Sequence, residues 1–243
     1  MTLKNDIVGF GLLIGYLIVA GLLPLLVVRK FLKVPFEVTR KMLHLMITLS
    51  IFPLVHLFSS WYAAVLATVA LVVLVYPVLA LVEHTRWYRR VAVEREGGEF
   101  KRSLVIHQLA MATLLSISWG LLGIDWQYIA VVAVMAWGFG DAAAALVGKA
   151  FGRRRIRHPR VEGAKTVEGT LSMAVVAGVA IFVTLLTYAG RPWTVSLAVA
   201  LLVAPVCSAV ELFTPRGLDT ITVPLSAAFA IVPLMLLFSF LGA

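Results

Sequence analysis

Eight stretches of mainly apolar residues constrain this chain more than any other feature. A helix that crosses a bilayer needs roughly 20 apolar residues. The stretches cover residues 7–28, 41–58, 61–83, 104–122, 127–148, 169–189, 193–212 and 221–241. They predict an all-α, polytopic bundle of transmembrane helices that forms one integral membrane domain over residues 1–243.

Two regions leave the number and continuity of the helices open. The second stretch holds His44, His56 and Pro53, so the chain has seven crossings if that stretch does not span. The last two stretches lie near further prolines, and we expect breaks there, because half-broken helices are tolerated at membrane depth where they line a cavity. These prolines are Pro205, Pro215 and Pro224.

The composition excludes a soluble domain. Charged residues make up 14% of the chain, against about 25% in soluble domains. The single cysteine, Cys207, rules out an intrachain disulfide and a cysteine-based metal site. One lysine precedes the first apolar run and no small-x-small cleavage pattern follows it, so we expect a retained first helix with no signal or transit peptide.

The distribution of cations predicts the orientation. Of the 21 Lys and Arg residues, all but Lys4 and Arg191 fall in residues 29–41, 86–102 and 149–165 or at Arg216. Cytoplasmic loops carry the excess of cations, so we expect both termini outside and the charged loops in the cytoplasm, in a prokaryotic plasma membrane. The net charge of +9 then reflects topology, and we expect no nucleic-acid partner.

The fifth stretch carries a carboxylate, Asp141, into the membrane. An ionised Asp there costs about 2.5–3.5 kcal/mol on insertion scales, so such residues usually face a site, a cavity or a partner. Gly140, Ala144 and Gly148 recur at four-residue spacing, a small-residue stripe that lets another helix approach closely. The alternative is that the stripe is packing alone and Asp141 pairs with an arginine for structure.

Cations and hydroxyls follow in the next loop and at the next helix start. Arg153, Arg154, Arg155, Arg157 and Arg160 suit phosphate, or are a positive-inside loop that touches lipid headgroups. At the helix start the free N–H groups and the dipole favour an anion, which Lys165, Thr166, Gly169 and Thr170 would contact. Glu168 is a site residue or merely complements the dipole.

Two further groups are candidates. Glu211 and Asp219 bracket a Pro/Gly turn and would supply a metal ligand and a base, although Asp219 could equally cap the last helix. Arg40, Lys41 and His44 open the second stretch, where a lone His near an interface is also commonly structural.

Five motifs in family order resemble the membrane-embedded CTP-dependent lipid kinases: dolichol kinase, phytol kinase and yeast-type diacylglycerol kinase, with CDP-diacylglycerol synthase more distant. The motifs are Arg40-Lys41-x-x-His44, Glu83-x-x-Arg86, Gly140-Asp141-x-x-Ala144-x-x-x-Gly148-Lys149-x-x-Gly152, Lys165-Thr166-x-Glu168-Gly169, and Glu211 followed by Leu218-Asp219 and Val223-Pro224. Thr220 departs from the acidic residue or Asn expected after Asp219, which weakens metal binding by that loop.

The resemblance implies Mg²⁺-dependent phosphoryl transfer from CTP to the hydroxyl of a membrane lipid alcohol, at the cytoplasmic side. The expected catalytic residues are Asp141, Lys165, Glu168 and Asp219, and the expected metal ligands are Asp141, Glu168, Glu211 and Asp219. The expected phosphate-binding residues are Lys149, Arg153, Lys165, Thr166, Gly169, Thr170, Arg40, Lys41 and His44.

Other functions stay open from the sequence. The acceptor is a phytol, polyprenol or dolichol-type alcohol, or diacylglycerol, and a cytidylyltransferase acting on phosphatidate would use the same donor and metal. An ion-coupled transporter is the non-enzymatic alternative, although its polar residues should spread through the midplane or its sequence should show inverted repeats. The oligomeric state is also open, a homodimer included.

Overall fold

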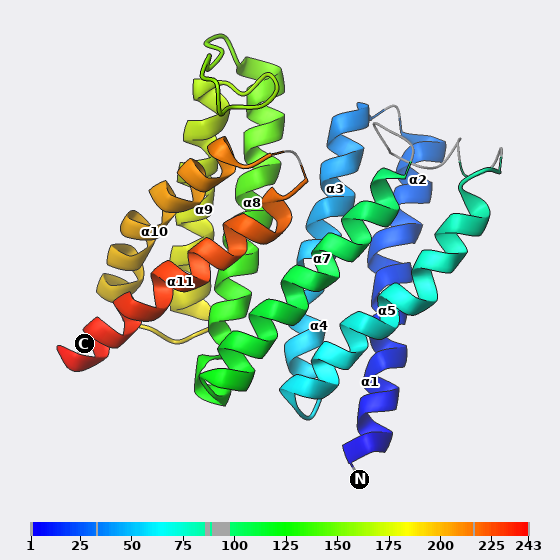
Figure 1. Ribbon diagram of the computed structural model, residues 1–243, viewed down its shortest axis with the longest axis horizontal. Helices are drawn as coiled ribbons and strands as arrows, with labels where there is room; N and C mark the ends of the chain where they lie inside the picture. The colour runs from blue at the N-terminus through cyan, green and yellow to red at the C-terminus, as the bar shows by residue number, and fades with distance from the viewer. Residues whose placement is uncertain (1, 33, 86–87, 89–97, 216, 243) are drawn as a thin grey trace. The chain divides into compact units, whose positions relative to one another are not determined.

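The computed structural model describes residues 2–32, 34–85, 88, 98–215 and 217–242, and these are almost entirely helical (Figure 1). Eight spans in this part of the chain are long and apolar enough to cross a membrane, which confirms the predicted helical class and the count of eight. They are Leu3–Val28, Phe36–His56, Trp61–Val82, Glu99–Leu121, Ile124–Phe151, Val167–Thr187, Trp193–Phe213 and Asp219–Phe240. The protein is therefore an integral, multi-pass membrane protein.

The chain divides into two compact units, Met1–Gly120 and Leu121–Ala243, so the predicted single domain stays a prediction. The first unit holds the first four spans. Its helices are α1 (Thr2–Tyr16), α2 (Leu23–Phe31), α3 (Phe36–Thr48), α4 (Ile51–His56), α5 (Trp61–Val82) and α7 (Glu99–Leu115). The π-helical segments η1 (Leu17–Leu22) and η2 (Ser116–Leu121) lie within the first and fourth spans.

The weak second span is divided where its sequence indicates. Helix α3 ends at Thr48 and α4 begins at Ile51, with Pro53 in the first turn of α4. Proline has no N–H to continue the ladder and is tolerated in a first turn, where that N–H lacks a helical partner anyway. The helix of this span is therefore interrupted at residues 49–50, just before Pro53, and the span is still long and apolar enough to cross a membrane.

The second unit begins with η3 (Ile124–Trp126) and holds α8 (Tyr128–Phe151), α9 (Val167–Thr187), α10 (Trp193–Phe213) and α11 (Asp219–Phe240). Each helix contacts the next, and α11 contacts α8, so the four form a closed ring of neighbours. Residues 128–134 of α8 are all buried. A helix that is apolar and buried all round is an interior helix, which makes α8 the span around which this unit packs.

The expected breaks at Pro205 and Pro224 are wrong. Helix α10 continues through Pro205, and α11 continues through Pro224 and Pro233. Membrane helices tolerate interior prolines because neighbouring helices and Ser or Thr side chains satisfy the freed backbone groups. Of the three prolines expected to break a helix, Pro215 alone lies between helices, in the short connection from α10 to α11.

The small-residue stripe of α8 is the surface on which α9 packs. A Cβ added to Gly148 would lie 3.5 Å from the Cα of Gly169, and one added to Gly140 would lie 2.5 Å from the Met173 sulfur and 3.2 Å from the Ala177 Cβ. The sequence numbers rise in α9 as they fall in α8, so the two helices run antiparallel. The predicted close approach is confirmed, and its partner is α9.

Candidate functional site

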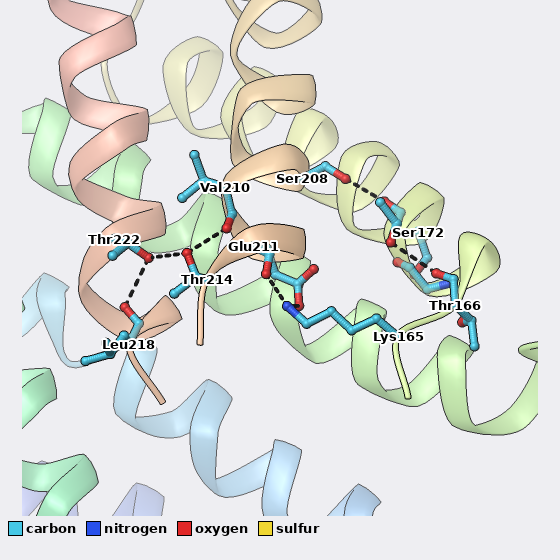
Figure 2. A network of polar contacts seen from close by, with 11 residues as sticks. Lys165, Thr166, Ser172, Ser208, Val210, Glu211, Thr214, Leu218 and Thr222 are labelled. Carbon is cyan, nitrogen blue, oxygen red and sulfur yellow. Dashed lines mark hydrogen bonds and ion pairs between the residues drawn. The ribbon is translucent and has the colours of Figure 1, made fainter. Parts of the chain in front are cut away.

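The N-terminus of α9, the C-terminus of α10 and the N-terminus of α11 meet in one polar network (Figure 2). It joins Lys165 to Glu211, Thr170 to Ser208, and Thr214 to Thr222. Apart from Asp141 and Lys149, which belong to α8, all the sequence-predicted site residues of the second unit lie in these helix ends or in the loop that leads from α8 to α9.

That loop folds back as a short hairpin. The Ile156 N–H donates to the Lys165 carbonyl at 2.9 Å, the Val167 N–H donates to the Arg154 carbonyl at 2.9 Å, and Arg155 and Thr166 form an isolated antiparallel bridge. The five arginines of this arginine hairpin, residues 152–166, are all exposed. The backbone is thus held against the start of α9 while the guanidinium groups face outward.

The hairpin is also attached to the end of α10. The His158 ring packs edge-on against Phe213, with ring centroids 5.7 Å apart, and its Nδ1 accepts from the Arg160 N–H at 3.1 Å. His158 and Phe213 carried no prediction, and an isolated His in a basic loop gives no sequence signal for such a contact.

Thr166 is the N-cap of α9. Its hydroxyl accepts from the Gly169 N–H at 3.1 Å, as side chains at this position typically do. A Cβ added to Gly152 would lie 2.6 Å from the Thr166 Cγ2, and one added to Gly169 would lie 2.9 Å from the Ala144 carbonyl oxygen. The two glycines are therefore required by the close fit of α8, α9 and the hairpin, and the Gly169 N–H is used by the cap.

Glu168 lies in the first turn of α9 and turns its carboxylate to the hairpin. Both carboxylate oxygens lie 3.3 Å from the Arg154 backbone nitrogen, which donates to them. A carboxylate in a first helical turn also complements the dipole. The contact supports a role for Glu168 in holding the arginine hairpin.

Lys165 forms a partly buried ion pair with Glu211. Its Nζ lies 3.1 Å from Glu211 Oε1 and also donates to the Glu211 backbone carbonyl, and the two side chains are 18% and 12% exposed. The sequence assigned these two residues to phosphate and to metal, and the structure brings them together. Lys149, by contrast, is exposed in the last turn of α8.

Hydroxyl groups connect the remaining helix ends. Ser208 donates to the Thr170 carbonyl at 2.8 Å, and Thr170 donates to the Thr166 carbonyl at 3.0 Å. Thr214 and Thr222 lie 3.0 Å apart, oxygen to oxygen, across the connection from α10 to α11. These serine and threonine links carried no prediction, and polar residues near the ends of apolar spans are the sequence signal available for them.

Asp219 is the first residue of α11, and the N-cap position belongs to Leu218, which makes no side-chain cap. Asp219 therefore lies inside the first turn, where a carboxylate complements the dipole. Gly217 allows the chain to turn into this helix, since its φ of 82° suits glycine.

Asp141 lies deeper in the second unit than the start of α9 does. It is seven residues before Gly148, which corresponds to about 10 Å along the axis of α8. Its neighbour Gly140 meets Met173, six residues into α9, whereas Gly148 meets the first turn of α9. The half-buried Asp141 is therefore about two helical turns further into the membrane than the Gly148–Gly169 crossing.

No group of three or more His, Cys, Asp and Glu side chains suited to a metal occurs among the described residues. The four predicted ligands Asp141, Glu168, Glu211 and Asp219 thus do not form an all-protein metal cage. Mg²⁺ on nucleotides is typically held by one or two carboxylates together with the phosphates and water. The carboxylates present suit that mode, and they do not suit a stand-alone metal centre.

Arg40, Lys41 and His44 belong to the first unit, on α3. Arg40 pairs with Glu37 at 3.2 Å and lies 3.8 Å from a Glu99 oxygen, and Lys41 is buried. In the motif that begins at Glu83, this residue pairs with Lys101 at 2.6 Å, and Arg86 lies outside the described residues.

Comparison with known proteins identifies one informative relative. A phytol kinase from Synechocystis sp. (strain ATCC 27184 / PCC 6803 / Kazusa) is 42% identical over 98 residues. The chain is thus similar to a phytol kinase over part of its length. The resemblance that its motifs indicate is thereby confirmed, over 40% of this chain and 40% of the relative's own length. No family model and no solved structure matches the chain.

Proposed function

We propose that this protein is a membrane lipid kinase that transfers a phosphoryl group from CTP to the hydroxyl of an isoprenoid alcohol of the phytol, polyprenol or dolichol type. The observation that carries the proposal is the set of cations at the helix ends of the second unit, above an intramembrane carboxylate, in a chain similar to a phytol kinase. Phosphoryl transfer needs this combination of positioning and charge neutralisation, with little covalent work by the protein.

The donor's phosphates would bind at the helix ends. Arg153, Lys149 and Lys165 supply cations there, and the start of α9 adds the positive end of a helix dipole. Arginine offers a planar fork of N–H donors that matches phosphate oxygens, whereas a lysine contributes a compact charge. A water-soluble nucleotide can reach this exposed hairpin directly from the aqueous side.

The acceptor would meet the donor from the membrane side. Asp141 lies about 10 Å below the glycine crossing, at a depth that a lipid alcohol can reach laterally. A carboxylate in that position would orient the hydroxyl or accept its proton. Bound Mg²⁺ would supply charge neutralisation on the transferring phosphoryl group, with Asp141 and Asp219 as the protein's ligands. Glu168 is turned to the hairpin, about two helical turns from Asp141.

The test is a transfer assay on detergent-purified protein with CTP labelled at the γ-phosphate, Mg²⁺, and a panel of phytol, farnesol, dolichol, diacylglycerol and phosphatidate. We expect label in an organic-soluble product with an isoprenoid alcohol, and loss of transfer in Asp141→Asn. Pyrophosphate release with phosphatidate alone would indicate a cytidylyltransferase. Absence of both reactions would contradict the proposal and favour a transporter.

A further inference from the structure

The Lys165–Glu211 pair joins two residues that the proposed chemistry needs separately. Lys165 immediately precedes the N-cap of α9, and Glu211 is in the last turn of α10. The ammonium group contacts both the carboxylate and the backbone carbonyl of Glu211. Lys165 thus also neutralises the negative end of the α10 dipole, as cations near helix C-termini do.

The Lys165–Glu211 ion pair is largely shielded from solvent. The two side chains are 18% and 12% exposed, so water and salt screen their attraction less than that of a surface pair. A polyphosphate that binds Lys165 therefore competes with the Glu211 carboxylate for the ammonium group. Both groups offer anionic oxygens to the same three ammonium donors, so the exchange replaces one charge-assisted contact by another.

The exchange does not require the hairpin to unfold. Lys165 is held in the hairpin by its backbone carbonyl, which accepts from Ile156, and that bond does not involve the side chain. The Glu168 carboxylate and the His158–Phe213 contact hold the hairpin independently. The Lys165 side chain can thus leave Glu211 while the arginines stay in place.

We propose that Glu211 is an internal competitor for the nucleotide: its carboxylate holds Lys165 in the empty site and is displaced when phosphates bind. This inference rests on the proposed function, because it assumes that a polyphosphate binds at these helix ends. The consequence is a coupling between the two events, since nucleotide binding displaces the Glu211 carboxylate from Lys165, and the displaced carboxylate can then help to hold the metal.

The coupling is measurable without catalysis, as the affinity of the full-length purified protein for CTP in EDTA, by calorimetry. We expect Glu211→Gln to bind metal-free CTP about fivefold to tenfold more tightly than wild type, which corresponds to about 1–1.4 kcal/mol. Lys165→Met should weaken binding at least about tenfold. Glu211→Ala serves as a second variant in case the amide still holds Lys165.

Two controls separate competition from a general change in charge. Glu162→Gln removes one carboxylate from the exposed part of the same hairpin and should change affinity less than about twofold. In a Lys165→Met background, Glu211→Gln should not change the affinity for CTP further, because no ammonium group remains for Glu211 to pair with.

The outcomes distinguish this inference from the proposed function. If wild type binds CTP and Glu211→Gln and Glu211→Ala bind it equally or more weakly, competition is refuted while the kinase assignment stands. The same holds if tightening persists in the Lys165→Met background. If wild type binds no CTP with or without Mg²⁺ and transfers no label, both ideas fail together.

Discussion

Gly169→Ala tests whether this glycine serves packing or phosphate binding. An added Cβ would lie 2.9 Å from the Ala144 carbonyl oxygen, 3.1 Å from the Thr166 hydroxyl and 3.3 Å from the Gly148 Cα. Two of these three atoms are backbone, so α8 and α9 must separate by a few tenths of an ångström. Overpacking of this kind typically costs 1–3 kcal/mol, and alanine's better helix propensity returns about 0.5–1 kcal/mol.

The net loss should be about 1–2 kcal/mol, which for a chain of this size lowers the melting temperature by about 2–8 °C. Cys207 provides the assay, because it is the only cysteine of the chain and is fully buried in α10, which packs on α9. A thiol-reactive fluorophore therefore reports unfolding of the second unit. The matched control is Gly11→Ala in α1, where an added Cβ meets nothing within 4 Å and should not lower the melting temperature.

A Gly169→Ala protein that has the wild-type melting temperature, yet binds CTP more weakly, would refute the packing role. It would show that the helix crossing tolerates a methyl group and that Gly169 lies against the bound nucleotide. Alanine retains the backbone N–H, so a purely hydrogen-bonding role would leave both quantities unchanged. We expect the melting temperature to fall first, and any change in affinity to follow from the displaced helix.

Three further predictions concern the cap, the carboxylate and the orientation. Thr166→Ala should cost about 1 kcal/mol and lower the melting temperature, whereas Thr166→Ser should stay near wild type, since only the hydroxyl caps α9; dye reactivity of Cys207 measures both. Asp141→Asn should lower lipid phosphorylation more than about a hundredfold in a protein with wild-type melting, because the ionised carboxylate is needed at the acceptor. Arg157→Cys with Cys207→Ala should react with an impermeant maleimide only in inside-out vesicles, and labelling of intact cells instead would reverse the topology.

The helices could be predicted from the sequence because each follows from local properties. Apolar runs of about 20 residues identify the spans, and a glycine–alanine stripe identifies a close helix crossing. The breaks expected at the interior prolines of α10 and α11 were wrong because the effect of a proline is not a local property. Their effect depends on what neighbouring helices and side chains offer to the freed backbone groups, and no local pattern contains that information.

The pairings within the site could not be predicted. Acidic side chains look equivalent in a sequence, yet Glu168 accepts a backbone N–H from Arg154 while Glu211 accepts from Lys165, 46 residues away. Such partners depend on which helix ends meet, and that follows from the tertiary arrangement of α9 and α10. The resemblance implies that both acids hold a metal, and that assignment stays a prediction, because the sequence does not show which groups lie next to them.

The Lys-Thr-x-Glu-Gly element shows how one helix start can serve both the fold and the chemistry. Each residue along a helix turns the side chain by about 100°, so neighbouring positions face different surroundings. At the start of α9, Gly169 faces α8, Glu168 faces the arginine hairpin, and Lys165, just before the cap, reaches α10. The spacing of the element is therefore fixed by three different neighbours, and packing alone requires most of it. The element indicates function because this packing places a lysine and five arginines beside the N-terminus of α9. Asp141 lies about two helical turns from them, within the membrane-spanning part of α8.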